Sequence, residues 1–558
     1  MKFRLIYFLL LSFLALQCAK QTAPTGGPKD ETPPKLRESF PKHEQINFKG
    51  DRIELSFDEP IQLNNPREQI IITPSVGKDF DVTFNKNRVT IQLKSRLQEN
   101  TTYTINFREA VQDLTEKNPA NAKIAFSTGD YLDSLQISGK VIDALTEVAP
   151  KSYTVALAEY SDTFNIFKHP GAWITQTDKT GKFSLENLKP GKYFLYAFND
   201  KSKNLLVDSK SETYGFISQP ITLEKNLDSL VIRTFKADMN RLKLMTARPT
   251  FAYFILRFSK SLTAYSITPV DSTKKVYASL EPDLTTVKLY NTFPNLDSMQ
   301  IKVHATDSMN FAADSLIYMK FPKKEATKDK FTSGIEYAIL TENNSLLTSQ
   351  ISFTKPIITF TPDSIYIKID SVTNIPFSPT DFTWNYNRTK LSINKKADIS
   401  VLFPKDTTSK EQATIKGPKS GPPTQPPQIA FTKAAFISAE GDTSISVSTP
   451  IKYVTLESTA IIEAEVKTTK NFVLQLVTKT GKVVAEVINQ KKFSFENLNP
   501  ETYLLRLIID VNGNGKWDPG NYQSKTEPEP VVYYRNPKGV TEISLKANWT
   551  LGPLLITY

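Results

Sequence analysis

Strand-like alternation of apolar and polar residues recurs along most of the chain. The segments 52–57 (RIELSF), 88–93 (RVTIQL) and 102–107 (TYTINF) alternate, and stretches such as 58–60 (DEP) between them favour turns. A period of two places the apolar side chains on one face of a strand. Short strands of this kind, close together along the chain, are typical of antiparallel sandwiches. The pattern predicts an all-β fold built from several sandwich domains in tandem.

The N-terminal segment departs from this pattern. Lys2 and Arg4 precede a nearly uncharged apolar run over 5–16, and a polar stretch with Pro and Gly follows. This order is typical of a secretory signal. The run is shorter than the roughly 20 apolar residues that a transmembrane helix needs. We therefore expect residues 1–17 to be a signal peptide that is removed.

Cys18 is the only cysteine in the 558 residues and directly follows that segment. The stretch 14–18 (LALQC) resembles a bacterial lipobox, with Gln17 where a small residue is common. The resemblance implies that Cys18 is lipidated, and several acyl chains together anchor a protein where one would not. Residues 18–34, which include many Pro and Gly, would then be a lipidated cysteine and a flexible tether. The alternative is an inert cysteine inside an uncleaved segment.

The first folded segment carries specific phrases. They are LSFDEPI at 55–61, NTTYTINFREAVQDLTEKNPA at 100–120 and FSTG at 126–129. These phrases resemble the bacterial Ig-like domain first described in surface-layer proteins, which implies an Ig-like domain over 35–129. The wording PTGGPKDETPP at 24–34 also resembles the N-termini of Bacteroidetes envelope lipoproteins that carry such a domain. An Ig-like fold by itself says little about a ligand.

A second kind of module is indicated over 135–235. It opens with ISGKVI at 137–142, and 180–193 reads TGKFSLENLKPGKY. These motifs resemble transthyretin-like and carboxypeptidase-regulatory-like sandwiches, which are usually structural. Four positions recur at a constant offset of 310 residues, Phe183, Leu188, Pro190 and Tyr193 returning as Phe493, Leu498, Pro500 and Tyr503. The repeat predicts a small C-terminal β-sandwich over 430–558.

Fainter copies of the LSFDEPI phrase indicate two further Ig-like units. LRFSKSL stands at 256–262 and ISFTKPI at 351–357. They predict Ig-like sandwiches over 237–322 and 333–404. The segment 405–428 is rich in Pro, Gly, Ser and Lys and is expected to be a disordered linker or loop. The expected fold class is thus all-β, with tandem Ig-like and transthyretin-like β-sandwich domains.

Charge and cysteine content exclude some function classes. The chain has 69 Lys and Arg against 58 Asp and Glu, a formal net charge of +11, and the two signs are interleaved throughout. Interleaved charge is typical of solvated strand faces and protected edge strands, so we expect no nucleic acid partner. The mature chain lacks a second cysteine for a disulfide, so core burial must stabilise each domain.

The sequence contains no motif of the common catalytic classes. The three histidines, His43, His169 and His304, are far apart along the chain. There is no His-Glu-x-x-His, no Gly-x-Ser-x-Gly and no P-loop. We therefore expect that the protein is not an enzyme.

One segment has the spacing of a calcium loop. Oxygen donors stand at positions 1, 3, 5, 7 and 9 of an EF-hand-like spacing, which suits a hard cation. These residues are Asp510, Asn512, Asn514, Lys516 and Asp518. Position 12 is Asn521 in place of the bidentate Glu, and no helical pattern flanks the loop. The alternative is an Asx- and Gly-rich hairpin turn without metal. The equivalent loop at 200–208 has Leu205 at the turning position and is expected to be metal-free.

A short pattern, Asp followed by Ser or Thr and then by an apolar residue or Thr, recurs along the chain. It resembles the O-glycosylation sequon of exported Bacteroidetes proteins, which implies bulky surface modifications. The candidate residues are Ser134, Ser229, Ser272, Ser298, Ser308, Ser315, Ser364, Ser371 and Thr407. The alternative is structural, because Asp-Ser favours a turn before a strand.

Together these features indicate an outer-membrane lipoprotein. We expect a non-catalytic scaffold or accessory subunit of an envelope complex that assembles or transports outer-membrane proteins, with other envelope proteins as partners. A periplasm-facing position is preferred, because Ala19-Lys20-Gln21 and not acidic residues follow Cys18. The alternative is a surface carbohydrate-binding or adhesion lipoprotein with a glycan partner. Its aromatic platform would come from Trp173, Trp384, Trp517 and Trp549.

Overall fold

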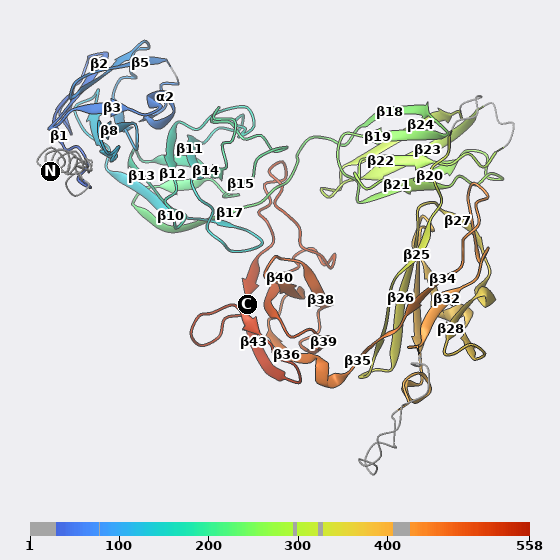
Figure 1. Ribbon diagram of the computed structural model, residues 1–558. Helices are drawn as coiled ribbons and strands as arrows, with labels where there is room; N and C mark the ends of the chain where they lie inside the picture. The colour runs from blue at the N-terminus through green and yellow to red at the C-terminus, as the bar shows by residue number, and fades with distance from the viewer. Residues whose placement is uncertain (1–29, 78, 294–297, 322–326, 405–424) are drawn as a thin grey trace, which may run out of the picture. The chain divides into compact units, whose positions relative to one another are not determined.

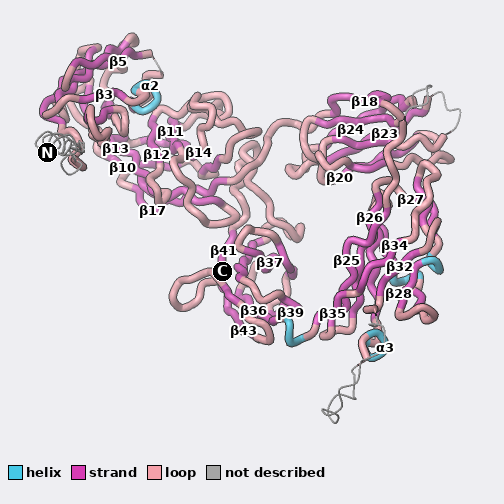
Figure 2. Tube along the Cα trace, viewed as in Figure 1, coloured by secondary structure: helices cyan, strands magenta, loops and turns pink. Residues whose placement is uncertain are grey.

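The computed structural model describes residues 30–77, 79–293, 298–321, 327–404 and 425–558 (Figure 1). Figure 2 shows that these residues form strands joined by loops, with only short helical segments such as α2 (Pro66–Gln69) and α3 (Ile399–Leu402). The predicted all-β fold of tandem β-sandwiches is confirmed. The signal peptide, Cys18, most of the tether, Thr407 and most of the linker lie outside the described residues.

The chain divides into two compact units. The first holds most of the chain up to residue 232, without the segments 142–148 and 208–218. The second holds those two segments and everything from residue 233 onward.

The first sandwich of the first unit is Ig-like. Its sheets have the strand orders β1-β2-β6-β5, β4-β7-β9 and β3-β8. These strands are β1 (Leu36–Phe40), β2 (Arg52–Phe57), β3 (Ile61–Leu63), β4 (Ile71–Thr73), β5 (Phe80–Asn85), β6 (Arg88–Leu93), β7 (Thr102–Asn106), β8 (Val111–Asp113) and β9 (Lys123–Ser127).

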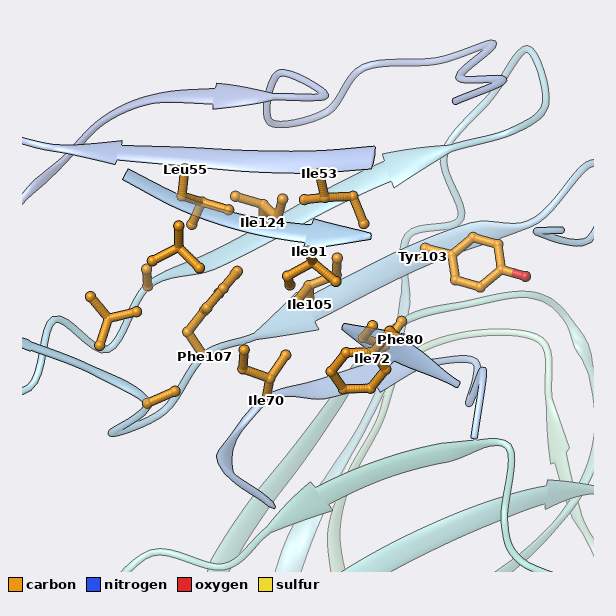
Figure 3. Packing of buried hydrophobic residues seen from close by; sticks show 14 of the residues in the cluster. Ile53, Leu55, Ile70, Ile72, Phe80, Ile91, Tyr103, Ile105, Phe107 and Ile124 are labelled. Atoms are coloured by element: carbon orange, nitrogen blue, oxygen red, sulfur yellow. The ribbon is translucent and has the colours of Figure 1, made fainter. Parts of the chain in front are cut away.

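Alternation along these strands places the core as the sequence predicted. Ile53 and Leu55 of β2 and Ile91 of β6 are fully buried, while the residues between them reach solvent in part. Figure 3 shows them facing Ile105 and Ile124 of the second sheet across the middle of the sandwich. Burying a side chain of this size stabilises the fold by about 1.5–3 kcal/mol, so the alternating pattern is also the main source of stability.

The second sandwich has the strand orders β13-β10-β17 and β12-β11-β14-β15, with β16 also on β14. Its strands are β10 (Leu135–Asp143), β11 (Thr154–Glu159), β12 (Trp173–Gln176), β13 (Lys182–Leu188), β14 (Gly191–Phe198), β15 (Tyr214–Phe216), β16 (Ile221–Leu223) and β17 (Leu227–Thr234). The Leu-x-Pro-Gly-x-Tyr motif forms the β13–β14 turn. There the hydroxyl of Tyr193 donates to the carbonyl of Lys189 at 2.8 Å and closes the turn.

The C-terminal sandwich has the same strand order. Its sheets are β39-β36-β43 and β38-β37-β40-β41, with β42 also on β40. The hydroxyl of Tyr503 donates to the carbonyl of Asn499 at 2.9 Å, as Tyr193 does in the other copy. The strands are β36 (Ala460–Lys467), β37 (Phe472–Thr478), β38 (Val483–Ile488), β39 (Lys492–Leu498), β40 (Thr502–Ile509), β41 (Val531–Tyr533), β42 (Ile543–Ser544) and β43 (Thr550–Thr557).

The part of the second unit from residue 233 onward begins with a sandwich of two sheets, β18-β19-β22-β21 and β20-β23-β24. It is the unit expected over 237–322, and its core contains Leu256 and Ile301, both fully buried. Its strands are β18 (Leu244–Thr250), β19 (Tyr253–Phe258), β20 (Ala264–Pro269), β21 (Ala278–Leu280), β22 (Thr286–Leu289), β23 (Met299–Thr306) and β24 (Ala312–Met319).

The next sandwich has the strand orders β30-β31-β26-β25-β35, β29-β28-β32-β34 and β27-β33. The strands are β25 (Ser333–Thr341), β26 (Leu346–Phe353), β27 (Ile357–Phe360), β28 (Ile365–Lys368), β29 (Asn374–Pro376), β30 (Phe382–Trp384), β31 (Lys390–Lys396), β32 (Gln428–Phe431), β33 (Phe436–Ser438), β34 (Val447–Pro450) and β35 (Lys452–Val454).

The predicted boundaries at residues 404 and 430 were wrong. β32 pairs with β28, and β35 pairs in parallel with β25, so this sandwich runs on to Val454. The segment 405–424 therefore interrupts one sandwich and does not separate two domains. The C-terminal sandwich starts at β36. The late strands are short and complete an existing core, so their own pattern did not reveal where they belong.

Candidate functional site

The candidate calcium loop follows β40 in the C-terminal sandwich. β40 ends at Ile509, and the next residue, Asp510, is only 2% exposed. Its carboxylate accepts hydrogen bonds from the backbone N–H groups of Asn514, at 3.0 Å, and of Gly515, at 2.8 Å. Gly515 has a φ of 77°, in the left-handed region that glycine adopts without strain. The buried carboxylate thus holds a tight turn of the chain around itself.

The turn brings Asn512, Asn514 and Asp518 together. The side-chain amides of both asparagines donate to Oδ2 of Asp518, at 2.5 and 2.6 Å. Oδ1 of Asn512 accepts from the N–H of Asn514, and Oδ1 of Asn514 accepts from the N–H of Lys516, both at 3.0 Å. All five residues that the sequence singled out therefore lie in one hydrogen-bonded loop.

Glu529 is a member of this site that sequence reasoning missed. It is 6% exposed, and its carboxylate accepts from the N–H groups of Val511, at 2.7 Å, and of Asp518, at 3.0 Å. Burial raises its pKa; these two hydrogen bonds lower the pKa in part, and the charges of Asp518 and Asp510 raise it further. Glu529 precedes β41 at no characteristic distance from the loop, so its spacing carried no signal.

The donor set suits a weak calcium site or none. Within the described residues, no three His, Cys, Asp or Glu side chains are grouped so that they could hold a metal ion. Calcium would rest on Asp510 and Asp518, with the amide oxygens of Asn512 and Asn514 and the carbonyl of Lys516. The loop also closes through its own hydrogen bonds, as the turn interpretation requires. Calcium binding stays a prediction.

The equivalent loop of the second sandwich shares much of this arrangement. Oδ1 of Asn204 accepts from the N–H of Leu206 at 2.8 Å, and the N–H of Asp208 donates to the buried carboxylate of Glu212 at 2.9 Å. Asp200 accepts from the N–H groups of Asn204 and Leu205, both at 3.1 Å, the same two positions that Asp510 holds. Leu205 has a φ of 62° where the C-terminal copy has glycine. Asp208 instead accepts from the hydroxyl of Ser211 at 2.7 Å. This loop thus repeats the turn, but Asp208 accepts from Ser211 where Asp518 accepts from two asparagine amides.

The Asp-Ser residues lie mainly at the surface. Asp271 accepts from the N–H of Thr273 at 3.0 Å and Asp370 from the N–H of Val372 at 2.7 Å, as expected for Asx turns. The turn interpretation and glycosylation of an exposed hydroxyl are compatible. Exposed are Ser134, Ser229, Ser272, Ser298, Ser308 and Ser371, whereas Ser315 and Ser364 are half-buried.

The four tryptophans do not form one aromatic platform. Trp173 is buried and packs edge-on against Tyr193. Trp384 packs against other rings of its own core, and Trp517 donates its indole N–H to the carbonyl of Glu529 at 3.1 Å. Trp549 is 45% exposed. Three of the four therefore have packing roles in their own domains.

No helix within the described residues is long and apolar enough to cross a membrane. The fold defines a class of protein first: an all-β chain of tandem sandwiches, two of which share one strand order. Residues 30–128 then match the bacterial Ig-like domain family. This match confirms the resemblance seen over 35–129. No curated protein matches the chain.

Solved structures of several surface proteins are similar at low identity. The surface layer protein SbsC, domains 1–6, is 10% identical over 92% of this chain and 68% of that one, with a TM-score of 0.15. BcpA, the major pilin subunit of Bacillus cereus, is 11% identical over 76% of this chain and 99% of that one, with a TM-score of 0.12.

A third similar structure is SGBP-B of the Bacteroides ovatus mixed-linkage glucan utilization locus, in complex with a mixed-linkage heptasaccharide. It is 10% identical over 74% of this chain and 92% of that one, with a TM-score of 0.14. These values are too low to say anything about the function of this chain.

Proposed function

We propose that the protein is a non-catalytic outer-membrane lipoprotein that serves as a scaffold or accessory subunit of an envelope complex. The observation that carries the proposal is the order of its parts: a bacterial Ig-like domain at 30–128 follows closely on a signal-like segment that ends in the only cysteine, Cys18. Lipidation would hold the sandwiches at the membrane. The complex would be one that assembles or transports outer-membrane proteins.

Edge strands offer a physical mode of partner binding. β38 is the end strand of its sheet, and its side chains Val483, Val484 and Ile488 are 40%, 42% and 48% exposed. An extended segment of a partner can add to such an edge through main-chain hydrogen bonds. Exposed apolar side chains on a free edge otherwise favour aggregation, so covering by a partner is the favourable outcome.

A periplasm-facing position fits this role. Ala19, Lys20 and Gln21 follow Cys18, at positions where surface-exported lipoproteins of Bacteroidetes often carry acidic residues. The excess of 69 basic over 58 acidic residues would also favour the anionic surface of a membrane. Protease added to intact cells would leave a periplasm-facing protein uncut.

The test is affinity purification of the native protein from gently solubilised membranes, followed by mass spectrometry, beside a Cys18→Ala control. We expect a defined set of outer-membrane proteins in near-stoichiometric amounts, lost or reduced with the control. Recovery of the lipoprotein alone, together with binding on a glycan array, would overturn the scaffold role in favour of carbohydrate binding or adhesion.

A further inference from the structure

A cleft of about 350 Å³ lies between the Ig-like sandwich and the second sandwich, inside the first compact unit. The Ig-like side contributes α2, β4 and Arg108, two residues after β7, and the other side contributes β11, β12 and the loop around Leu205. Clefts of this size between domains are preferred places for small ligands. Sequence patterns gave no sign of it, because its two walls come from different domains.

Direct contacts fix the two walls against each other. The N–H of Ser75, after β4, donates to the carbonyl of Ala172, before β12, at 2.6 Å. Lys203 forms an ion pair with Glu68 of α2 at 2.5 Å. Because these contacts flank the cleft, it is a preformed feature of this unit.

The lining combines an apolar part with many polar and charged groups, among them the acids Glu68 and Asp200. Ile70, Ile72 and Ile174 line the cleft and are each less than a tenth exposed. Thr154 and Gln176 add polar side chains from β11 and β12. The three isoleucines can contact an apolar body, and the polar groups beside them can fix its orientation.

Arg108 is the cation of this lining that is not paired with an acid. Its Nε donates to the carbonyl of Gln69 at 2.7 Å, and its Nη2 donates to the carbonyl of Glu68. Two of its five N–H donors are thus used to hold the guanidinium in place. Within the described residues it makes no ion pair, whereas Lys203 is neutralised by Glu68 and Arg67 pairs with Asp81 at 3.0 Å.

The charge on Arg108 persists in this position. It is half-buried, and burial lowers its pKa, while the exposed neighbour Glu109 raises the pKa in part. A guanidinium remains protonated at neutral pH even so. A half-buried cation without a carboxylate partner is poorly compensated, and an anionic ligand group would supply the missing partner.

We propose that this cleft binds a small ligand with an apolar body and a terminal carboxylate, which Arg108 holds while the isoleucine walls cover the apolar part. The planar guanidinium matches a carboxylate, and its held orientation reduces the entropy lost on binding. Two sources share this chemistry: a free small acid and the C-terminus of an extended peptide. The site is independent of the proposed scaffold role.

The experiment uses the full chain in lipid nanodiscs and isothermal titration calorimetry. The probes are N-acetyl-phenylalanine, its uncharged amide, and an acetylated tripeptide that ends in phenylalanine. We expect the acid to bind in the millimolar range or tighter and the amide at least about ten-fold more weakly, the loss of one charge-assisted contact. If the tripeptide binds more tightly than the acid, the natural ligand is the C-terminus of a peptide. If it binds equally or more weakly, the natural ligand is a free small acid.

Three variants separate the site from general effects. Arg108→Gln should weaken the binding of the acid at least about ten-fold and leave the binding of the amide unchanged. Gln176→Trp should fill the cleft from an exposed position and block both probes, which keeps the test valid if Arg108→Gln fails to fold. Arg88→Gln removes a cation in β6 outside the cleft lining and should change nothing. No binding of the acid, equal binding of acid and amide, or unchanged binding to Gln176→Trp would overturn the proposal.

Discussion

Lys355 should be among the most sensitive positions of the chain, although the sequence places it in an ordinary turn phrase. Its side chain is 1% exposed, and its Nζ lies 2.6 Å from Oε2 of Glu440 and 2.9 Å from Oδ2 of Asp442. The side chain of Glu440 is fully buried. Lys355→Met keeps most of the length of the side chain and removes its charge, so the change leaves a buried carboxylate without its main partner.

The structure sets the size of the effect. Removing one partner of a buried ion pair costs about 3–5 kcal/mol. Lys328 lies 3.8 Å from Oε1 of Glu440 and can compensate part of the charge, and the side chain of Asp442 is 36% exposed. We therefore expect Lys355→Met to lower the free energy of unfolding of this sandwich by about 3 kcal/mol, the lower end of that range. Lys355→Met combined with Glu440→Gln should recover most of the loss, because the fully buried carboxylate is then gone and the remaining one, Asp442, is partly solvated.

The assay must resolve one sandwich in a multi-domain chain, because a single unfolding midpoint is not defined for the whole. Hydrogen exchange with mass spectrometry in increasing urea reports the opening free energy of peptides from 333–454. Arg67→Gln is the control: its pair with Asp81 is exposed, 66% and 47%, and should contribute no more than about 1 kcal/mol. A loss below about 1 kcal/mol for Lys355→Met, or no recovery in the double variant, would refute the reasoning.

The same cluster predicts a pH dependence with two limits. Burial raises the pKa of Asp442, but hydrogen bonds from Lys355 and Ser438 outweigh it, so the pKa lies below its ordinary 3.8. Burial lowers the pKa of Lys355, but hydrogen bonds to Glu440 and Asp442 outweigh it, so the pKa lies above 10.5. The stability that Asp442 contributes is present above pH 3.8 and is lost as the pH falls below this value. The stability that Lys355 contributes is present below pH 10.5 and is lost as the pH rises above this value. Exchange that fails to quicken at either limit would contradict these shifts.

Three further outcomes are expected. Calcium at a few millimolar should stabilise the C-terminal sandwich by about 1 kcal/mol, as expected for a weak extracellular site. Asp510→Asn should abolish this stabilisation, whereas Asp200→Asn should not. Identical melting curves in calcium and in chelator would exclude calcium binding. Gly139→Ala should destabilise the second sandwich by about 1–3 kcal/mol in urea, because a Cβ there would lie 2.1 Å from the carbonyl of Leu230. Gly334→Ala, which meets nothing within 4 Å, should be nearly neutral. Tyr503→Phe should lower the unfolding free energy by about 1 kcal/mol in the same assay, because it removes the hydrogen bond that closes the turn. An unchanged urea midpoint would show that this hydrogen bond is dispensable.

Local patterns predicted those parts of the fold that depend on neighbours in the chain. The alternation in 52–57 and 88–93 placed buried residues correctly, because period and burial are coupled within one strand. The constant offset between Tyr193 and Tyr503 identified a repeat whose two copies share strand order and turn. Both are properties that a short window of sequence contains.

Long-range partners could not be predicted in this way. Lys355 meets Glu440 only because β27 pairs with β33, and Arg108 lines a cleft only because two domains pack together. Glu529 contacts the loop that follows β40, although it lies 11 residues after the last loop residue, Asp518. In each case the chemistry arises from residues distant in sequence, and no local periodicity or spacing relates them.

The interrupted sandwich has a consequence for how the chain can be built and broken. β25 and β28 are synthesised well before their neighbours β35 and β32, so this sandwich must wait with two open edges until the residues from 428 onward are made. A single cut between 405 and 424 would, by the same pairing, leave two fragments held together by strand hydrogen bonds and a common core. Such a nicked protein would migrate as two bands after denaturation and as one species before it.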